Sequence, residues 1–222
     1  MHIQIADEPF LDLTAWWIAS HGMEFSGLGL VERERDVLNV VGVDLLNVGS
    51  FGYTEIPEHR QRALPLDPRR KLWFHRHPLG NAAKPGPQNW SGTDHGTAER
   101  TPLGGIPQLV QWSTSMVFTP TGWTGRVDVY LPKLQTFYVP VYPTVPSKEQ
   151  MERAYERVTP QLMEYVAELT AEFNELMSFK RYMPTEFDEP QDVEPLRIER
   201  RKKAPSVWVG GINIFRRYYE DR

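Results

Sequence analysis

Leu72-Trp73-Phe74-His75-Arg76-His77-Pro78 joins a short apolar run to two imidazoles that stand two residues apart. If Leu72 to His75 form a β-strand, the alternation of side chains places His75 and His77 on the same side of the chain. Two ring nitrogens can then reach one metal ion without distortion of the backbone. Arg76 lies between them, so we expect it on the opposite face and assign it no catalytic role.

A hydroxyl and a carboxylate follow at a short spacing in Trp90-Ser91-Gly92-Thr93-Asp94. Asp94 can supply an oxygen ligand, which completes a set of His75, His77 and Asp94 and leaves the fourth tetrahedral position for water. Three protein ligands with one open position are typical of a catalytic zinc site rather than a structural one.

The same residues also have simpler interpretations. A His-x-His pair arises by chance, and Glu24, further upstream, can be a solvated residue that follows a helix. Ser91 can be the N-cap of a helix, with Asp94 at the third helical position, where the helix dipole favours an acid. This capping role is compatible with a metal site, because Ser91 can cap a helix while its hydroxyl faces the ion.

Taken together, the polar positions resemble a known motif. Glu24 followed by Gly27, then His75-x-His77-Pro78, then Ser91-x-x-Asp94 resemble the JAMM motif of the JAB/MPN metalloprotease family, over roughly the first two-thirds of the chain. The resemblance implies an α/β (α+β) fold, with a cytidine-deaminase-like mixed β-sheet flanked by helices. One departure is the stretch 79–90, which is longer than the family's usual connection and is interpreted as a loop insertion beside the site.

The resemblance also implies an activity: zinc-dependent hydrolysis of peptide or isopeptide bonds at the C-terminus of a ubiquitin-like protein. His75, His77 and Asp94 would hold Zn²⁺, Glu24 would act as general base, and Ser91 would donate a hydrogen bond to the developing oxyanion. The implied partners are a ubiquitin-like substrate and, beyond it, E1-like or E2-like proteins of such a pathway.

Two other functions remain open at this stage. The chain can be a non-catalytic scaffold of the same family, or a different peptidase within it. Scaffold members usually lack some ligands or the glutamate, and this sequence retains all of them, which favours an enzyme. The absence of cysteine excludes a thiol hydrolase, and a serine nucleophile is disfavoured because no His-Asp relay remains apart from the proposed ligands.

Composition sets further expectations. A length of 222 residues suggests a domain over 1–180 and a C-terminal extension over 181–222. A formal net charge of -4 argues against nucleic acid as the main partner. No apolar run reaches membrane-spanning length and the first residues do not form a secretory signal, so we expect a cytoplasmic protein without a membrane partner.

Periodicity predicts the remaining elements. We expect a helix over 9–21, a hairpin of strands 27–31 and 37–43, and no regular element in 47–70. Three strands are expected over 108–118, 126–131 and 135–142, and a small hairpin over 207–215. Ser147 and Gln150 form a capping box that opens a long helix, whose apolar stripe should pack in the core. Because this stripe continues across Pro160, a kinked helix to about Phe179 is favoured over two helices.

Two features near Asp94 complete the predicted site. His95 is a rival ligand, but adjacent helical residues diverge by about 100 degrees, so only one of the two can face the ion, and the family pattern selects Asp94. The segment 97–107 contains Pro102, Gly104, Gly105 and Pro107. It is predicted to be a loop on the side where the tail of a substrate enters.

Overall fold

The computed structural model describes residues 1–78, 86–92, 94, 111–130 and 132–182, together with 208–209 and 212–213. The strands of the main sheet are β1 (His2–Ile5), β2 (Phe25–Glu34), β3 (Val37–Val48), β4 (Arg70–Arg76), β5 (Trp112–Thr119), β6 (Gly122–Val129), β7 (Gln135–Val139) and β8 (Val141–Tyr142). The helices are α1 (Asp7–Ala19), α2 (Glu58–Ala63), the single turn η1 (Pro87–Asn89), α5 (Lys148–Arg157) and α6 (Pro160–Tyr182). A second pair of strands, β9 (Trp208–Val209) and β10 (Ile212–Asn213), lies near the C-terminus of the sequence.

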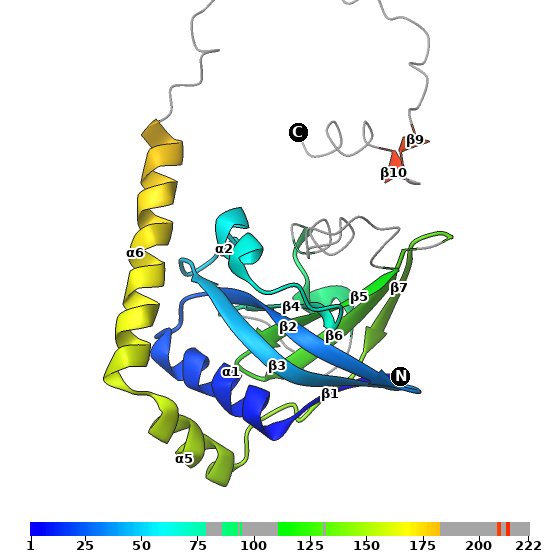
Figure 1. Cartoon of the computed structure of the whole chain (residues 1–222), viewed down its shortest axis with the longest axis horizontal. Helices are drawn as coiled ribbons and strands as arrows, with labels where there is room; N and C mark the ends of the chain where they lie inside the picture. Colours follow the sequence, from blue (N-terminus) through cyan, green and yellow to red (C-terminus); the bar gives the residue numbers. More distant parts are fainter. Residues whose placement is uncertain are drawn as a thin grey trace, which may run out of the picture. The chain divides into compact units, whose positions relative to one another are not determined.

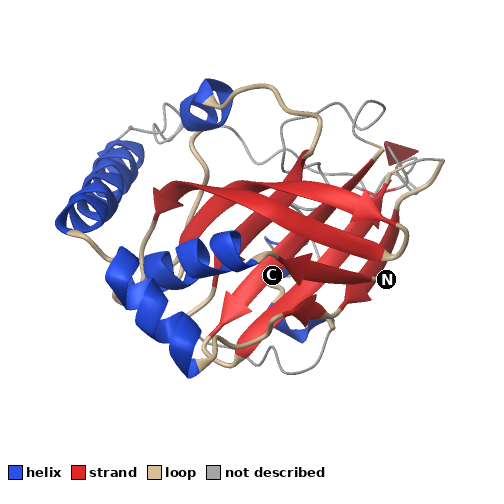
Figure 2. Ribbon diagram, turned by 60° about the horizontal axis from the view of Figure 1, so that its bottom comes forward, coloured by secondary structure: helices blue, strands red, loops and turns tan. Residues whose placement is uncertain are grey.

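The eight strands form one mixed sheet in the order β7-β6-β5-β4-β2-β3-β1-β8. In its centre, β4 pairs antiparallel with β2 and parallel with β5. The sheet curls until its two ends meet, because a Cβ added to Gly125 of β6 would lie 2.7 Å from Ile3 of β1 and 2.9 Å from Val141 of β8. A side chain at Gly125 would therefore separate these strands. Figure 2 shows the curled sheet with the helices α1 and α5 across one side.

The alternation of side chains along β4 divides the core into two clusters. Leu72 and Phe74 point into the larger cluster, which α1 covers with Phe10 and Leu13. Trp73 points the other way, into a smaller cluster with Leu28, Leu46, Trp90 and Val117. His75 stacks on Trp73 and so lies on this second face, away from the cluster that α1 covers. Figure 1 shows α1 along one side of the sheet.

The long helix predicted after Ser147 is two helices, and the prediction of a single kinked helix is wrong. The capping box of Ser147 and Gln150 is present. However, α5 ends at Arg157, and Val158 leaves the helical region with φ −75° and ψ 89°. Pro160 has no N–H and disfavours the helical conformation of Thr159 before it. Thr159 instead caps α6, since its Oγ1 accepts the N–H of Leu162 at 3.3 Å.

The apolar stripe of these helices is only partly buried. Val166, Leu169 and Phe173 of α6 pack in the core. Tyr155 and Tyr165, which belong to the same predicted stripe, are 59% and 39% exposed. The expectation that the whole stripe packs in the core is therefore wrong for these positions.

Other elements differ from the prediction in their bounds. Helix α1 begins at Asp7 and ends at Ala19. In the first hairpin, β2 is longer than predicted at both ends, whereas β3 begins at Val37 as predicted and extends further, to Val48. The sequence pattern did not predict β1, nor α2 within the aperiodic segment. The third predicted strand is interrupted after Val139 and continues as β8.

The chain separates into two compact units, Met1–Met177 and Ser178–Arg222. In the second unit, β9 and β10 pair antiparallel as the small hairpin that the sequence predicts. None of the helices in the described part of the chain is both long enough and apolar enough to cross a bilayer.

Candidate metal centre

His75 and His77 lie at the end of β4 with their rings together. His75 pairs with Ser26 of β2 on one side and with Val117 of β5 on the other. The N–H of His77 donates to the carbonyl of Phe118 at 2.7 Å, so the chain stays extended beyond the last residue of the strand. The two Nε2 atoms are 2.8 Å apart. Alternation along an extended chain therefore produces the pair of neighbouring nitrogens.

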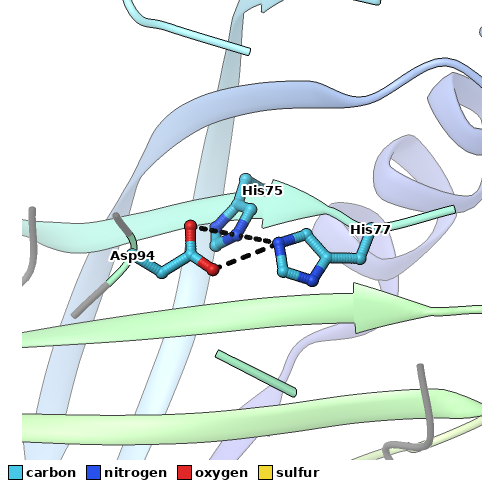
Figure 3. Close-up of side chains that lie close together, drawn as sticks. All are labelled: His75, His77 and Asp94. Atoms are coloured by element: carbon cyan, nitrogen blue, oxygen red, sulfur yellow. Dashed lines mark hydrogen bonds and ion pairs between the residues drawn. The ribbon is translucent and has the colours of Figure 1, made fainter. Parts of the chain in front are cut away.

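Asp94 approaches the two histidines from a different segment. One carboxylate oxygen lies 3.1 Å from Nε2 of His75, and the other lies 3.2 Å from Nε2 of His77. Figure 3 shows the three side chains pointing toward one another, with the two imidazoles on the same side of the carboxylate. The structure thus brings together the three residues that the sequence predicted as metal ligands.

A reciprocal cap fixes the orientation of Asp94. Its N–H donates to Oγ of Ser91 at 3.2 Å, and the N–H of Ser91 donates to its carboxylate at 2.6 Å. Gly92 and Asp94 are helical. The structure therefore places Ser91 in the capping role that the sequence suggested. Because the hydroxyl oxygen accepts in this cap, the hydroxyl proton remains a donor for a further group.

The donor atoms fit a metal ion. Among the described residues, His75, His77 and Asp94 each offer one donor atom, and these atoms all lie within 4.8 Å of one another. In a tetrahedral zinc site, bonds of about 2.0–2.1 Å place neighbouring donor atoms roughly 3.3 Å apart. In this cluster Nε2 of His75 lies 2.8 Å from Nε2 of His77 and 3.1 Å from one oxygen of Asp94, while the other oxygen of Asp94 lies 3.2 Å from Nε2 of His77. This buried group can hold a metal ion.

The three groups have coupled charges. Burial lowers the pKa of His75 below its usual value, although the carboxylate of Asp94 opposes this shift. Burial also acts to lower the pKa of His77, but the hydrogen bond and charge of Asp94, the charge of Glu24 and a backbone hydrogen bond with Asn89 together outweigh burial and raise the pKa. Burial would raise the pKa of Asp94, yet the hydrogen bonds with His75 and His77 hold it well below its usual range. Asp94 is therefore a carboxylate, and His77 is the imidazole that more readily carries a proton.

Part of the predicted insertion supports the two imidazoles directly. Trp73 stacks on His75 with ring centroids 4.4 Å apart, and Trp90 contacts the same ring edge-on at 6.2 Å. A hydrogen bond with the backbone of Asn89 acts on His77. Asn89 and Trp90 therefore belong to the wall of the site, which corrects the interpretation of the whole stretch as a loop beside it, whereas Pro87 and Gln88 are exposed. Residues 79–85 of the same stretch lie outside the described residues.

Glu24 lies immediately before β2 and is only 8% exposed, so it is not a solvated residue. Its N–H donates to the carbonyl of Ser50, and its carbonyl accepts the N–H of Gly49, both at 2.8 Å. Burial raises the pKa of Glu24 to about 7, with Asp94 adding to the shift and the positive charges of His77 and Arg76 opposing it. Glu24 is therefore a buried carboxyl that interacts electrostatically with His77 and Asp94 but does not belong to the group of three possible ligands.

Arg76 was assigned no role from the sequence, and the structure gives it a specific contact. Its guanidinium Nη1 donates to the carbonyl of Met23 at 2.7 Å, and the residue is 5% exposed. The signal in the sequence was a charged residue directly after a run of apolar strand residues and between the two histidines. The support from Asn89 and Trp90 was also missed, and no periodic pattern around these residues indicates it. His95 and the predicted loop 97–107 lie outside the described residues.

Neither a protein-family profile nor a curated protein sequence matches the chain. Among solved structures, a protein of Desulfitobacterium hafniense determined in solution is similar, with 18% sequence identity and a TM-score of 0.36. The match covers 66% of this chain and 96% of that protein. At this level of similarity the two chains are not assigned to one fold.

Proposed function

We propose that the chain is a JAMM-type zinc metalloprotease of the JAB/MPN family that hydrolyses peptide or isopeptide bonds at the C-terminus of a ubiquitin-like protein. The observation that carries this proposal is the convergence of His75, His77 and Asp94 within 4.8 Å, beside a buried carboxyl outside the ligand group. A nitrogen and oxygen ligand set of this kind suits zinc, and three protein ligands leave a position for water.

In this proposal the residues of the chain have separate roles. Zinc bound by the three ligands would activate a water molecule and polarise the scissile carbonyl. Glu24 takes the proton of the attacking water and delivers it to the leaving amine, a role that suits a pKa of about 7. Ser91 donates a hydrogen bond from its hydroxyl to the developing oxyanion. The reciprocal cap with Asp94 keeps that hydroxyl beside the ligand.

Exposed apolar side chains near Glu24 support a protein substrate. Phe51 and Tyr53 are 69% and 39% exposed, and they follow Ser50, whose carbonyl accepts the N–H of Glu24. Leu66, in the same connection between β3 and β4, is fully exposed. Exposed apolar residues gathered on one segment are typical of a surface that contacts another protein. In this proposal the connection between β3 and β4 contacts the ubiquitin-like domain of the substrate.

The deciding experiment compares the parent with Glu24→Gln on a panel of ubiquitin-like fusion proteins, with zinc measured on the same samples. The amide cannot accept the proton of water, so turnover should fall by about 10²–10⁴-fold while the zinc content stays near that of the parent. Glu34→Gln, at the exposed end of β2, is the matched control and should cleave like the parent. Equal cleavage by parent and Glu24→Gln contradicts the role of Glu24. A zinc-loaded parent that cleaves none of the panel supports a non-catalytic scaffold instead.

A further inference from the structure

Arg76 is a buried cation whose hydrogen bond goes to a neutral group rather than to a carboxylate. It is 5% exposed, and its hydrogen bond goes to a neutral acceptor, the carbonyl of Met23. Its Nε is buried and has no hydrogen-bond partner, and within the described ranges no salt bridge involves this guanidinium. A buried charge without a hydrogen-bonded counter-ion lowers stability, and the carboxyl of Glu24 is a charge that acts on Arg76. A cation kept in such a position calls for a role beyond packing.

The contact of Arg76 is adjacent to Glu24. Met23 precedes Glu24 directly, and this pair follows a turn in which Gly22 has a φ of +94°. The Met23–Glu24 segment is therefore held from two sides. Ser50 and Gly49, which follow β3, bind the amide and the carbonyl of Glu24, and Arg76 at the end of β4 binds the carbonyl of Met23.

We propose that Arg76 is a positioning residue that fixes Glu24 relative to the metal ligands, by anchoring the backbone of Met23 from the strand that carries His75 and His77. This inference rests on the proposed function, in which Glu24 is the general base. Three successive residues of β4 and its extension then serve one site: the two histidines hold the ion on one face, and Arg76 holds the base from the other. The positive charge of Arg76 also favours the ionised form of Glu24, against the larger effect of burial.

If Arg76 only stabilised the fold, its loss would affect the whole domain and not the Met23–Glu24 segment in particular. The first test therefore measures the local stability of that segment. Hydrogen exchange is measured on the full chain for the amides of Glu24 and Gly49, relative to amides in the β5–β6 ladder. Loss of a hydrogen bond from a charged donor should accelerate exchange at these two amides by about tenfold in Arg76→Gln. Arg76→Lys, which keeps the charge with a shorter reach, should give about threefold. If Arg76→Gln does not fold, Arg76→Lys decides the result alone.

Arg70 provides a matched control, because it is the other arginine of β4 and lies at the opposite end of the strand. It pairs with Asp44 at 2.5 Å. Arg70→Gln should lower stability while leaving the amides of Glu24 and Gly49 unchanged relative to the β5–β6 ladder. Parent-like relative exchange in the Arg76 variants, or equal acceleration in the Arg70 variant, overturns the proposal.

The second test measures whether Arg76 acts through Glu24. In the parent background, Arg76→Gln should lower kcat by about tenfold, with KM and zinc content near those of the parent. In the Glu24→Gln background the same change should lower kcat by less than about twofold, because coupled residues are not additive. An equal loss in both backgrounds overturns the proposal. If the parent cleaves no substrate, the proposed function fails by itself, and the exchange experiment still decides whether Arg76 positions Glu24.

Discussion

At the scale of single residues, His77 and Asp94 make the contact on which the metal set depends. Each of them lies at hydrogen-bond distance from the other, and removal of either leaves two donor atoms at most. His77→Ala or Asp94→Ala should therefore lose most of the zinc, of which the parent should carry about one ion per chain. Elemental analysis of the purified variants measures this. His59→Ala is the control, since His59 lies in α2 and pairs with Glu172. Near-stoichiometric zinc in both site variants contradicts the ligand assignment.

Glu24 should make the stability of the metal-free protein depend on pH. Its pKa is about 7 in the folded chain against an ordinary value of 4.5, so the folded state retains a proton that the unfolded state has lost between these values. The cost of the buried carboxylate thus develops as the pH rises from 4.5 to 7 and is complete above 7. With about 1.4 kcal/mol for each pKa unit, the ceiling is about 3 kcal/mol.

Glu24→Gln removes this ionisation. Denaturant unfolding of metal-free parent and variant should give similar free energies of unfolding near pH 4, and a variant that is more stable by up to about 3 kcal/mol near pH 8. A difference that does not change with pH contradicts the raised pKa.

At the scale of elements, the break between α5 and α6 depends on Thr159. Its hydroxyl accepts the N–H of Leu162, and Pro160 prevents the preceding turn from continuing as helix. Thr159→Ala should lower the free energy of unfolding by about 1 kcal/mol, the usual cost of a lost N-cap. Thr159→Ser keeps the hydroxyl and should stay near the parent, as measured by denaturant unfolding. Equal stability of the alanine and serine variants means that the cap contributes nothing here.

The segment 86–90 should affect the metal rather than only the substrate. Trp90 packs against His75 in the smaller core cluster, and outer contacts of this kind typically change metal affinity by about 10–100-fold. Trp90→Ala should therefore weaken zinc binding in a competition assay with a chelator. Shortening of residues 79–85 should instead alter KM or the range of substrates while zinc stays bound. Unchanged zinc affinity in Trp90→Ala would mean that Trp90 does not support the metal ligands.

At the scale of the whole molecule, closure of the sheet depends on Gly125. A Cβ there would meet Ile3 and Val141 at 2.7 and 2.9 Å, and the carbonyl of Val139 at 3.0 Å. Gly125→Ala should cost about 1–3 kcal/mol of unfolding free energy, the usual penalty of overpacking. Gly52→Ala is the matched control, since a Cβ at Gly52 has no neighbouring atom within 4 Å. Equal stability of the two variants would show that the β6–β8 closure adjusts without cost.

The sequence predicted the parts of the molecule that depend on local pattern. Alternation along β4 was sufficient to place His75 and His77 together, and the spacing of Ser91 and Asp94 was sufficient to predict their cap. The parts that were missed depend on tertiary contacts. The strand β1 has only four residues and is defined by its partners β3 and β8. The contact of Arg76 with the carbonyl of Met23 joins residues far apart in the sequence, so no local pattern predicts it.

The apolar period also gave a wrong prediction where the local effect of a proline outweighed it. The apolar period continues across Pro160, and this continuity favoured one kinked helix. The backbone of Thr159 and Pro160 ended α5 regardless, because proline restricts the residue before it and cannot donate to the preceding turn. The side chains of Tyr155 and Tyr165 likewise have the right period but are exposed, and Tyr165 contacts β3 through its hydroxyl, which donates to the carbonyl of Leu45 at 3.1 Å.

The hydrogen bond between His77 and Asp94 links metal binding at this site to the release of a proton. The carboxylate raises the pKa of His77 and thereby favours the protonated ring, whereas an imidazole must be neutral to bind a metal. Uptake of a divalent cation would therefore release that proton to the solvent and replace one positive charge beside Asp94 with two. The affinity for the ion should therefore fall as the pH falls, and release of the ion would restore the hydrogen bond between His77 and Asp94.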